Sequence, residues 1–211
     1  MILSIVITAV VAYFLGNLNG AVLISRAVAH EDVRTKGSGN AGLTNFYRTY
    51  GAKYALGVIL FDMGKTVVAC LLGGVMFNHL FGDWALGVLL GGLGCELGHM
   101  FPVFFGFKGG KGILSGGTLV WLLDWRMGLI AWGLFAVLWL VTKYVSLGSI
   151  SATVSMPITT YLFCGHSLLY TVLAVLVSAL VLWCHRENIT RLLRHEERKF
   201  QWHTGAPKNE Q

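Results

Sequence analysis

Residues 98–112, GHMFPVFFGFKGGKG, form a polar, glycine-rich break in a chain that is otherwise strongly apolar. The break, which we call the second motif, contains His99, Lys108 and Lys111. Glycine lets backbone N–H groups curl around an anion, and neighbouring lysines add positive charge. The simpler interpretation is a turn between two membrane helices with its lysines on the cytoplasmic side. Both interpretations place apolar helices on either side, which indicates a helical membrane protein.

The composition favours an all-α integral membrane protein. The chain has 211 residues, of which 55% are hydrophobic and 12% charged, and its mean hydropathy is +0.65. This composition excludes a soluble domain, and we predict a single polytopic membrane domain over residues 1–211 with about seven transmembrane helices. Residues 113–163 contain segments shorter than the roughly 20 residues of a full span, so Ile113–Val141 is either two short helices or a re-entrant pair. The predicted spans are Met1–Leu23, Ala52–Phe77, Trp84–Phe105, Ile113–Leu123, Met127–Val141, Ile150–Phe163 and Ser167–Cys184.

The positions of the basic residues predict the orientation. Most Lys and Arg residues follow the first, third and fifth spans or the last one. The positive-inside rule places these segments in the cytoplasm, so the N-terminus is outside and the C-terminus cytoplasmic. In residues 185–211, Leu192 and Leu193 oppose Arg191 and Arg194. We therefore predict a basic amphipathic cytoplasmic tail whose helix, from His185 to Phe200, lies on the inner leaflet.

A first motif, GSGNAGLTNFYR at residues 37–48, follows the first span. It fits G-x-G-x-x-G, but a membrane helix and a charged loop precede it and βαβ alternation is missing, which argues against a dinucleotide fold. Free backbone N–H groups, the polar side chains of Ser38, Asn40, Thr44 and Asn45, and the guanidinium of Arg48 suit a phosphate. The glycines that we expect at the phosphate are Gly37 and Gly39 here, and Gly109, Gly110 and Gly112 in the second motif.

Four polar residues lie inside predicted spans. Asp62 and Lys65 are three residues apart, share a helix face and should pair, because an isolated charge in hydrocarbon is costly. The pair is either structural or functional. Glu96 and His99, also three apart, lie beside the second motif; they are either functional groups or a buried hydrogen-bonded pair.

A third motif, HRENITRLL at residues 185–193, places His185 and Asn188 one helical turn apart, which an amphipathic helix does not require. By charge, all three motifs fall on the cytoplasmic side. They contain donors and cations, so we expect anionic ligands with more than one phosphate, and neither a metal, a cofactor nor nucleic acid. G-x-S-x-G, H-E-x-x-H, H-x-x-x-x-D and a complete Walker motif are missing from the sequence, which favours catalysis by positioning and charge stabilisation.

The three motifs together resemble the signature segments of the bacterial acyl-phosphate:glycerol 3-phosphate acyltransferases. Their order, spacing and the chain length agree, and the resemblance covers nearly the whole chain. The sequence departs from the family at Ser115, where threonine is usual, and at Thr66 and His195, where glycine is usual.

The resemblance implies a seven-span enzyme of the bacterial plasma (inner) membrane with its active site facing the cytoplasm. Such an enzyme moves an acyl group from acyl phosphate to the 1-hydroxyl of glycerol 3-phosphate, giving lysophosphatidic acid and inorganic phosphate in phospholipid biosynthesis. Membrane lipid and the soluble enzyme that supplies acyl phosphate are further candidate partners. The alternative is an anion or organophosphate transporter that uses the same cytoplasmic loops. Matched position by position, the resemblance implies that Ser38, Arg48 and Lys108 or Lys111 hold phosphates, that Asn40 and the loop glycines donate hydrogen bonds, and that His99, His185 and Asn188 orient the glycerol phosphate or the reacting carbonyl.

Overall fold

The computed structural model describes residues 1–201, which fold entirely into helices and connecting segments. Apolar stretches form the long helices, and the residues at the breaks between helices include Asn19, Gly51, Gly82, Asp124 and Lys143. The elements are α1 (Ile2–Asn17), α2 (Gly20–Ala29), η1 (Val33–Thr35), α3 (Leu43–Tyr50), α4 (Ala52–Phe81), α5 (Trp84–Met100), η2 (Val103–Phe105), α6 (Ile113–Leu123), α7 (Trp125–Thr142), α8 (Val145–Phe163), α9 (Leu168–Cys184) and α10 (Arg186–Leu193).

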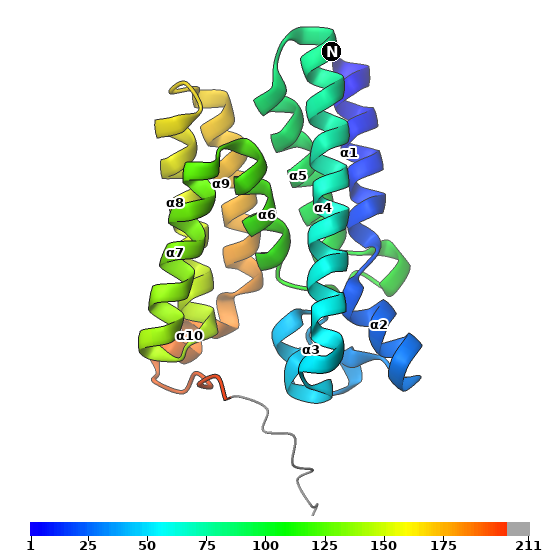
Figure 1. Cartoon of the computed structure of the whole chain (residues 1–211), viewed down its shortest axis with the longest axis vertical. Helices are drawn as coiled ribbons and strands as arrows, with labels where there is room; N and C mark the ends of the chain where they lie inside the picture. The colour runs from blue at the N-terminus through cyan, green and yellow to red at the C-terminus, as the bar shows by residue number, and fades with distance from the viewer. Residues whose placement is uncertain (202–211) are drawn as a thin grey trace, which may run out of the picture.

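The long helices form two groups that stand side by side (Figure 1). Helices α1, α4 and α5 make one group, α7, α8 and α9 make the other, and the short α6 lies between them. A core that includes Leu89 of α5, Leu119 of α6, Met156 of α8 and Val177 of α9 joins the two groups. The short helices α2, α3 and α10 all lie at the same end of the bundle (Figure 1), where a second core packs α2 and α3 against α4.

Glycines on α5 allow its close approach to α1 and α4. A Cβ added at Gly87 would lie 2.2 Å from the carbonyl oxygen of Gly73, and one at Gly98 would lie 2.0 Å from the carbonyl oxygen of Tyr13. Small residues bring membrane helices into backbone contact in this way. The helical spacing of glycines along the third predicted span therefore reflects packing.

The first predicted span is broken near its end. We expected one helix over Met1–Leu23, but α1 ends at Asn17 and α2 begins at Gly20. The side chain of Asn19 accepts a hydrogen bond, 3.1 Å long, from a backbone N–H in the first turn of α2, so Asn19 is the N-cap of that helix. The break leaves the carbonyl groups of Gly16 and Leu18 without helical partners, and both accept hydrogen bonds from a buried lysine of α4.

The described residues contain four helical segments that are long and apolar enough to cross a membrane. A fifth arises if α9 and α10, which are bent by 63° at their junction, count as one span. Helix α6 has the bounds predicted for it and only 11 residues, and α8 is rich in Ser and Thr. The protein is thus a helical membrane protein, and the number of seven crossings stays a prediction. The four segments are Ile2–Ala29, Ala52–Phe81, Trp84–Phe105 and Trp125–Thr142.

The segment after α9 folds back against the bundle. Its helix, α10, ends at Leu193, whereas we expected helix as far as Phe200. The backbone N–H of Phe200 instead donates a hydrogen bond, 2.7 Å long, to the carbonyl oxygen of Lys143 at the end of α7. The tail from residue 194 to 201 therefore closes over the end of α7 and α8, and residues 202–211 of the predicted tail lie outside the described part.

Candidate phosphate-binding site

A cavity of about 1130 Å³ lies between the two helix groups and contains almost every predicted site residue in its wall. Its polar end is built by the three motifs, which are far apart in the sequence. Apolar side chains such as Ile59 of α4, Val120 of α6 and Met156 of α8 form the rest. The predicted site residues in the wall are Ser38, Gly39, Asn40, Thr44, Asn45, Arg48, His99, Lys108, Gly109, Gly110, Lys111, Gly112, His185 and Asn188.

Asn45 shapes the first motif from within. Its Nδ2 lies 3.0 to 3.1 Å from three backbone carbonyl oxygens, one of which belongs to Asn40, and its Oδ1 accepts from the N–H of Ser38 at 2.9 Å. Three carbonyls share two amide hydrogens, which leaves none for a ligand. Gly37, at φ +59°, is the one predicted residue outside the cavity wall; a Cβ there would lie 2.3 Å from Asn45 Oδ1. Asn45 and Gly37 thus hold the loop that presents Ser38 and Gly39.

Backbone contacts join the first motif to the second. The N–H of Ala41 donates to the carbonyl oxygen of Gly109 at 3.4 Å. Arg34 donates from Nη1 to the carbonyl oxygen of Lys108 at 3.0 Å, and its Nη2 lies 2.7 Å from Asp32. The hydrogen bond from Arg34 holds the pKa of Asp32 well below its usual range, despite partial burial. These contacts join the two glycine-rich segments into one wall of the cavity.

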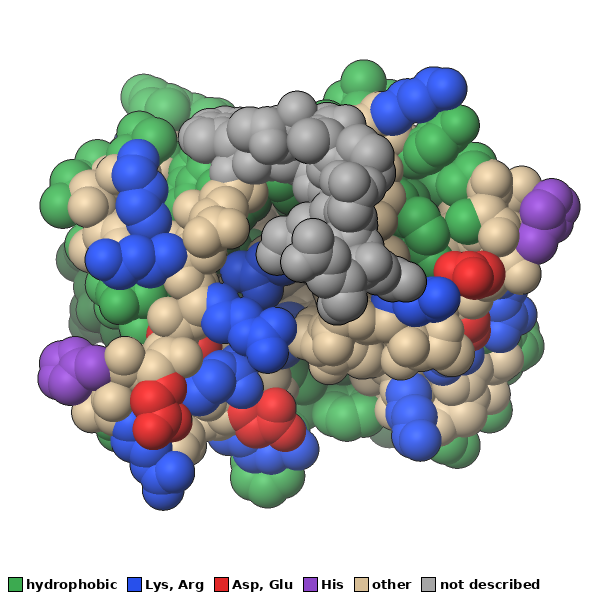
Figure 2. All heavy atoms as spheres, turned by 90° about the horizontal axis from the view of Figure 1, so that it is seen from below, with side chains coloured by type: hydrophobic (Ala, Val, Ile, Leu, Met, Phe, Trp, Pro, Cys, Tyr) green, Lys and Arg blue, Asp and Glu red, His purple; other side chains and the backbone are tan. Residues whose placement is uncertain are grey.

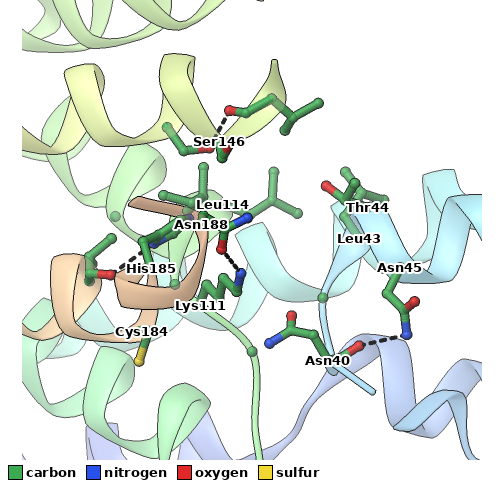
Figure 3. A pocket seen from close by; sticks show the side chains of 18 of the residues that line it. Asn40, Leu43, Thr44, Asn45, Lys111, Leu114, Ser146, Cys184, His185 and Asn188 are labelled. Carbon is green, nitrogen blue, oxygen red and sulfur yellow. Dashed lines mark hydrogen bonds between the residues drawn. The ribbon is translucent and has the colours of Figure 1, made fainter. Parts of the chain in front are cut away.

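Lys111 links the second motif to the third (Figure 3). Its ammonium donates to Oδ1 of Asn188, and Nδ2 of Asn188 donates to Glu197 at 2.7 Å. Glu197 also accepts from the hydroxyl of Ser146 on α8 at 2.8 Å and from Nε of Arg191 at 2.7 Å. Glu197 and Ser146 complete the site, although the sequence singled out neither. The one sequence feature that could have indicated Glu197 is that it is an acidic residue within a strongly basic tail.

Positive charge is in excess at the polar end. Arg48 forms no ion pair with any residue that the structure describes, and burial, followed by the nearby charge of Arg198, lowers its pKa. Burial, followed by the charge of Arg191, also lowers the pKa of Lys111. Burial raises the pKa of Glu197, but hydrogen bonds from Arg191, Asn188 and Ser146 outweigh it and leave that pKa below its usual value. Figure 2 shows Lys and Arg side chains gathered on this face of the molecule, which suits an anionic ligand.

His185 has a defined orientation in the cavity wall. Its Nδ1 lies 2.8 Å from the carbonyl oxygen of Val181, one turn earlier on α9. Because a carbonyl only accepts hydrogen bonds, Nδ1 carries a hydrogen, and in the neutral ring Nε2 is then an acceptor. His185 can accept a hydrogen bond from a hydroxyl group.

The two pairs of polar residues inside the helices, Asp62 with Lys65 and Glu96 with His99, differ in their contacts. The predicted pair of Asp62 and Lys65 is confirmed, with Nζ and Oδ1 2.8 Å apart. His99 contacts Lys65, with Nδ1 2.9 Å from Nζ. Glu96 does not bond to His99, and its buried carboxylate accepts no hydrogen bond from any residue in the described part of the chain. Among residues 1–201, no three His, Cys, Asp or Glu side chains are grouped so as to hold a metal ion.

The fold and the cavity define a class: a helical membrane protein with one cavity that has a cationic, donor-rich end and an apolar side. A family model described as glycerol-3-phosphate acyltransferase matches residues 6–195. The chain belongs to the glycerol-3-phosphate acyltransferase family.

Proteins of this name are similar to the chain over nearly their full length. The protein of Shouchella clausii (strain KSM-K16) is 40% identical, with 95% of this chain and 98% of the relative aligned. That of Prochlorococcus marinus (strain MIT 9301) is 38% identical, with 90% and 94% aligned. A crystal structure of PlsY (YgiH), an integral membrane glycerol 3-phosphate acyltransferase in its glycerol 3-phosphate form, has a TM-score of 0.83 and 34% identity, with 94% and 96% aligned. The lysophosphatidic acid form has a TM-score of 0.80.

Proposed function

We propose that the protein transfers a fatty acyl group from acyl phosphate to the 1-hydroxyl of glycerol 3-phosphate, giving lysophosphatidic acid and inorganic phosphate. The observation that carries this proposal is the convergence of all three motifs on one cavity with a cationic end and an apolar side. Glycerol 3-phosphate carries a phosphate and no acyl chain, and acyl phosphate carries both a phosphate and an acyl chain. The cavity has a suitable surface for each part, and the relatives named above are glycerol-3-phosphate acyltransferases.

The phosphate groups bind at the polar end. Arg48, which forms no ion pair with a described residue, offers a bidentate guanidinium, and Ser38 and Asn40 of the first motif add donors. Of the two lysines of the second motif, Lys111 is fixed by Asn188 within the cavity, whereas the side chain of Lys108 is exposed. We therefore assign Lys111 to the reacting region and Lys108 to the entrance. Gly109, Gly110 and Gly112 let the backbone approach the ligand.

The reaction needs positioning more than covalent help. The 1-hydroxyl oxygen attacks the carbonyl carbon of the acyl phosphate, a new C–O ester bond forms, and the bond between that carbon and the bridging phosphate oxygen breaks. The hydroxyl proton passes to the departing phosphate, so the products are the ester and inorganic phosphate. His185 accepts a hydrogen bond from the hydroxyl and so aims it, and Lys111 stabilises negative charge at the leaving group. In this scheme the protein supplies no essential general base.

The cavity also supports an orientation in the membrane. Helices α3 and α10, which carry parts of the first and third motifs, lie at the same end of the bundle (Figure 1), and Lys and Arg side chains gather on that face (Figure 2). We assign this end to the cytoplasm, with seven crossings and the N-terminus outside. A soluble enzyme could then deliver acyl phosphate from the cytoplasm. A transporter would need binding residues spread through the bundle, whereas the predicted phosphate-binding residues that line this cavity all come from the three motifs.

The test is release of inorganic phosphate by purified protein given palmitoyl phosphate and glycerol 3-phosphate. We expect release that needs both substrates, yields lysophosphatidic acid and is lost in Arg48→Ala. Lys53→Ala is the matched control, because Lys53 is an exposed cation outside the cavity wall. Folded protein that releases no phosphate but carries labelled phosphate into liposomes would instead establish the transporter.

A further inference from the structure

The ammonium group of Lys65 is buried at the junction of three helices. Nζ lies 2.8 Å from Oδ1 of Asp62, 3.2 Å and 2.9 Å from the carbonyl oxygens of Gly16 and Leu18, and 2.9 Å from Nδ1 of His99. Its side chain is 3% exposed. The two carbonyls are those freed by the break between α1 and α2. The break therefore supplies part of the shell that fixes this lysine.

These contacts determine which nitrogen of His99 carries hydrogen. A carboxylate and two carbonyl oxygens can only accept hydrogen bonds, so the group among them is a donor, as an ammonium is, and its three hydrogens are shared among these oxygens and Nδ1 of His99. An N–H at Nδ1 would point at this ammonium and be repelled. Nδ1 of His99 is therefore the acceptor, and the hydrogen of the neutral ring lies on Nε2.

The other ring nitrogen lies beside Gly110 in the wall of the substrate cavity. A Cβ added at Gly110 would lie 2.2 Å from Nε2 of His99, and both residues line the cavity. No residue in the described part of the chain accepts a hydrogen bond from Nε2. The ring thus presents an unused donor beside the glycines of the second motif.

We infer that Asp62 and Lys65 are positioning residues that hold His99 as the neutral Nε2–H tautomer, and that His99 donates a hydrogen bond to an anionic oxygen of the substrates. This inference rests on the proposed acyl transfer for its kinetic consequences, but not for the tautomer. It gives His99 a role opposite to that of His185, whose Nδ1 carries the hydrogen. One histidine is built to donate from Nε2, and the other is built to accept at Nε2.

The other groups around the His99 ring do not compete with Lys65 in setting which ring nitrogen carries the hydrogen. From α4 the charged groups that face it are Lys65 and Asp62, whose Oδ1 lies 3.8 Å from Nδ1. On α5 itself Glu96 lies one turn away. The break after α1 and the second motif contribute backbone groups. Removal of the ammonium would leave the Asp62 carboxylate as the nearest partner, and a carboxylate requires a hydrogen on Nδ1.

The first measurement is nitrogen NMR of protein labelled with ¹⁵N-histidine, with the signals of His99 identified by their loss in His99→Gln. We expect an unprotonated Nδ1 and a protonated Nε2 that do not change between about pH 6 and pH 8, close to where a free histidine would titrate. A hydrogen on Nδ1, or a ring that titrates in this interval, would overturn the inference. This experiment needs neither substrate nor activity.

The second measurement compares two variants. Lys65→Met should move the hydrogen of His99 to Nδ1 and reduce acyl transfer about 100-fold, the usual effect of losing a donor to developing charge. The double variant Asp62→Asn with Lys65→Gln removes both charges but keeps an N–H donor toward Nδ1, so it should keep the Nε2–H tautomer and most of the activity. Equal loss in both variants, with the tautomer unchanged in each, would leave only a structural role for the pair and overturn the inference.

The kinetic constants indicate which substrate oxygen accepts the hydrogen bond from His99. A fall in kcat at unchanged KM indicates the carbonyl oxygen in the transition state, and a higher KM for one substrate indicates the phosphate of that substrate. Either result supports donation by His99. If the protein showed no acyl transfer at all, the proposed function would fail while the NMR result still tested the tautomer.

Discussion

Glu197→Gln should weaken the hydrogen bonds that hold the third motif, and it tests whether the tail stabilises the site. The carboxylate accepts hydrogen bonds from Ser146, Asn188 and Arg191, and its side chain is 8% exposed. An amide retains one acceptor oxygen but directs an NH₂ group at the Arg191 donor, so at least one charge-assisted bond is lost and the others weaken. Charge-assisted bonds contribute about 1.5–3 kcal/mol each, and water has some access here, so we expect the unfolding free energy to fall by about 2 kcal/mol.

The activity should also fall when this hydrogen-bond network is weakened, because Asn188 accepts a hydrogen bond from the Lys111 ammonium. We expect kcat/KM for phosphate release to fall about 10- to 100-fold, as for a misplaced positioning group. Glu196→Gln is the matched control, since it removes the same charge from the neighbouring exposed side chain. Indistinguishable unfolding curves and rates for the two variants would refute this reasoning.

The same carboxylate gives a pH dependence of defined sign. The pKa of Glu197 is lower in the folded protein than in the unfolded chain. Its contribution to stability is therefore complete above the ordinary carboxyl pKa, about 4.3, and is lost as the pH falls through the lower folded pKa. The difference in stability between the wild type and Glu197→Gln should be constant at neutral pH and shrink below about pH 4.

Three further changes test the packing, the first loop and the choice of lysine. Gly98→Ala should lower the yield of folded protein, because its Cβ would lie 2.0 Å from a backbone carbonyl of α1, while Gly133→Ala, with no atom within 4 Å, should not; size-exclusion profiles compare them. Asp32→Asn should destabilise the protein at neutral pH but not at low pH, because the carboxylate has a depressed pKa and its contribution is lost on acidification; unfolding across pH checks this. Lys111→Met should reduce kcat/KM far more than Lys108→Met, and equal effects in the phosphate-release assay would contradict our assignment.

Hydropathy predicted the helices well, because apolar length is a local property of the sequence. The bounds of Ile113–Leu123 agree with α6. The break within the predicted span Met1–Leu23 was missed, since asparagine is tolerated in a helix and Asn17 and Asn19 find their partners far away. Asn17 accepts from the backbone of residue 104, and Asn19 donates to the carbonyl oxygen of Ala41. Such contacts cannot be read from spacing along one segment.

The candidate site was predicted only in part, because contacts between distant segments cannot be read from spacing along one segment. Glycines next to cations marked the first two motifs, and all but Gly37 of the predicted residues line the cavity. Asn45 appeared as a phosphate ligand from its residue type, yet its amide is consumed within the loop. Glu197 could not be found, because its importance depends on Ser146, which lies 51 residues earlier in the chain.

The two cavity histidines show how the membrane fold limits the chemistry. Each ring has one nitrogen in contact with a group that sets its hydrogen-bonding role: a backbone carbonyl, which only accepts, for His185, and the Lys65 ammonium, which only donates, for His99. A ring held in this way orients a donor or an acceptor without needing to exchange a proton. Acyl phosphate already contains a good leaving group, and its own phosphate can take the hydroxyl proton. An enzyme for this substrate gains more from fixed hydrogen-bond directions than from a titrating base, and the break after α1, which supplies two of the four contacts of Lys65, serves that purpose.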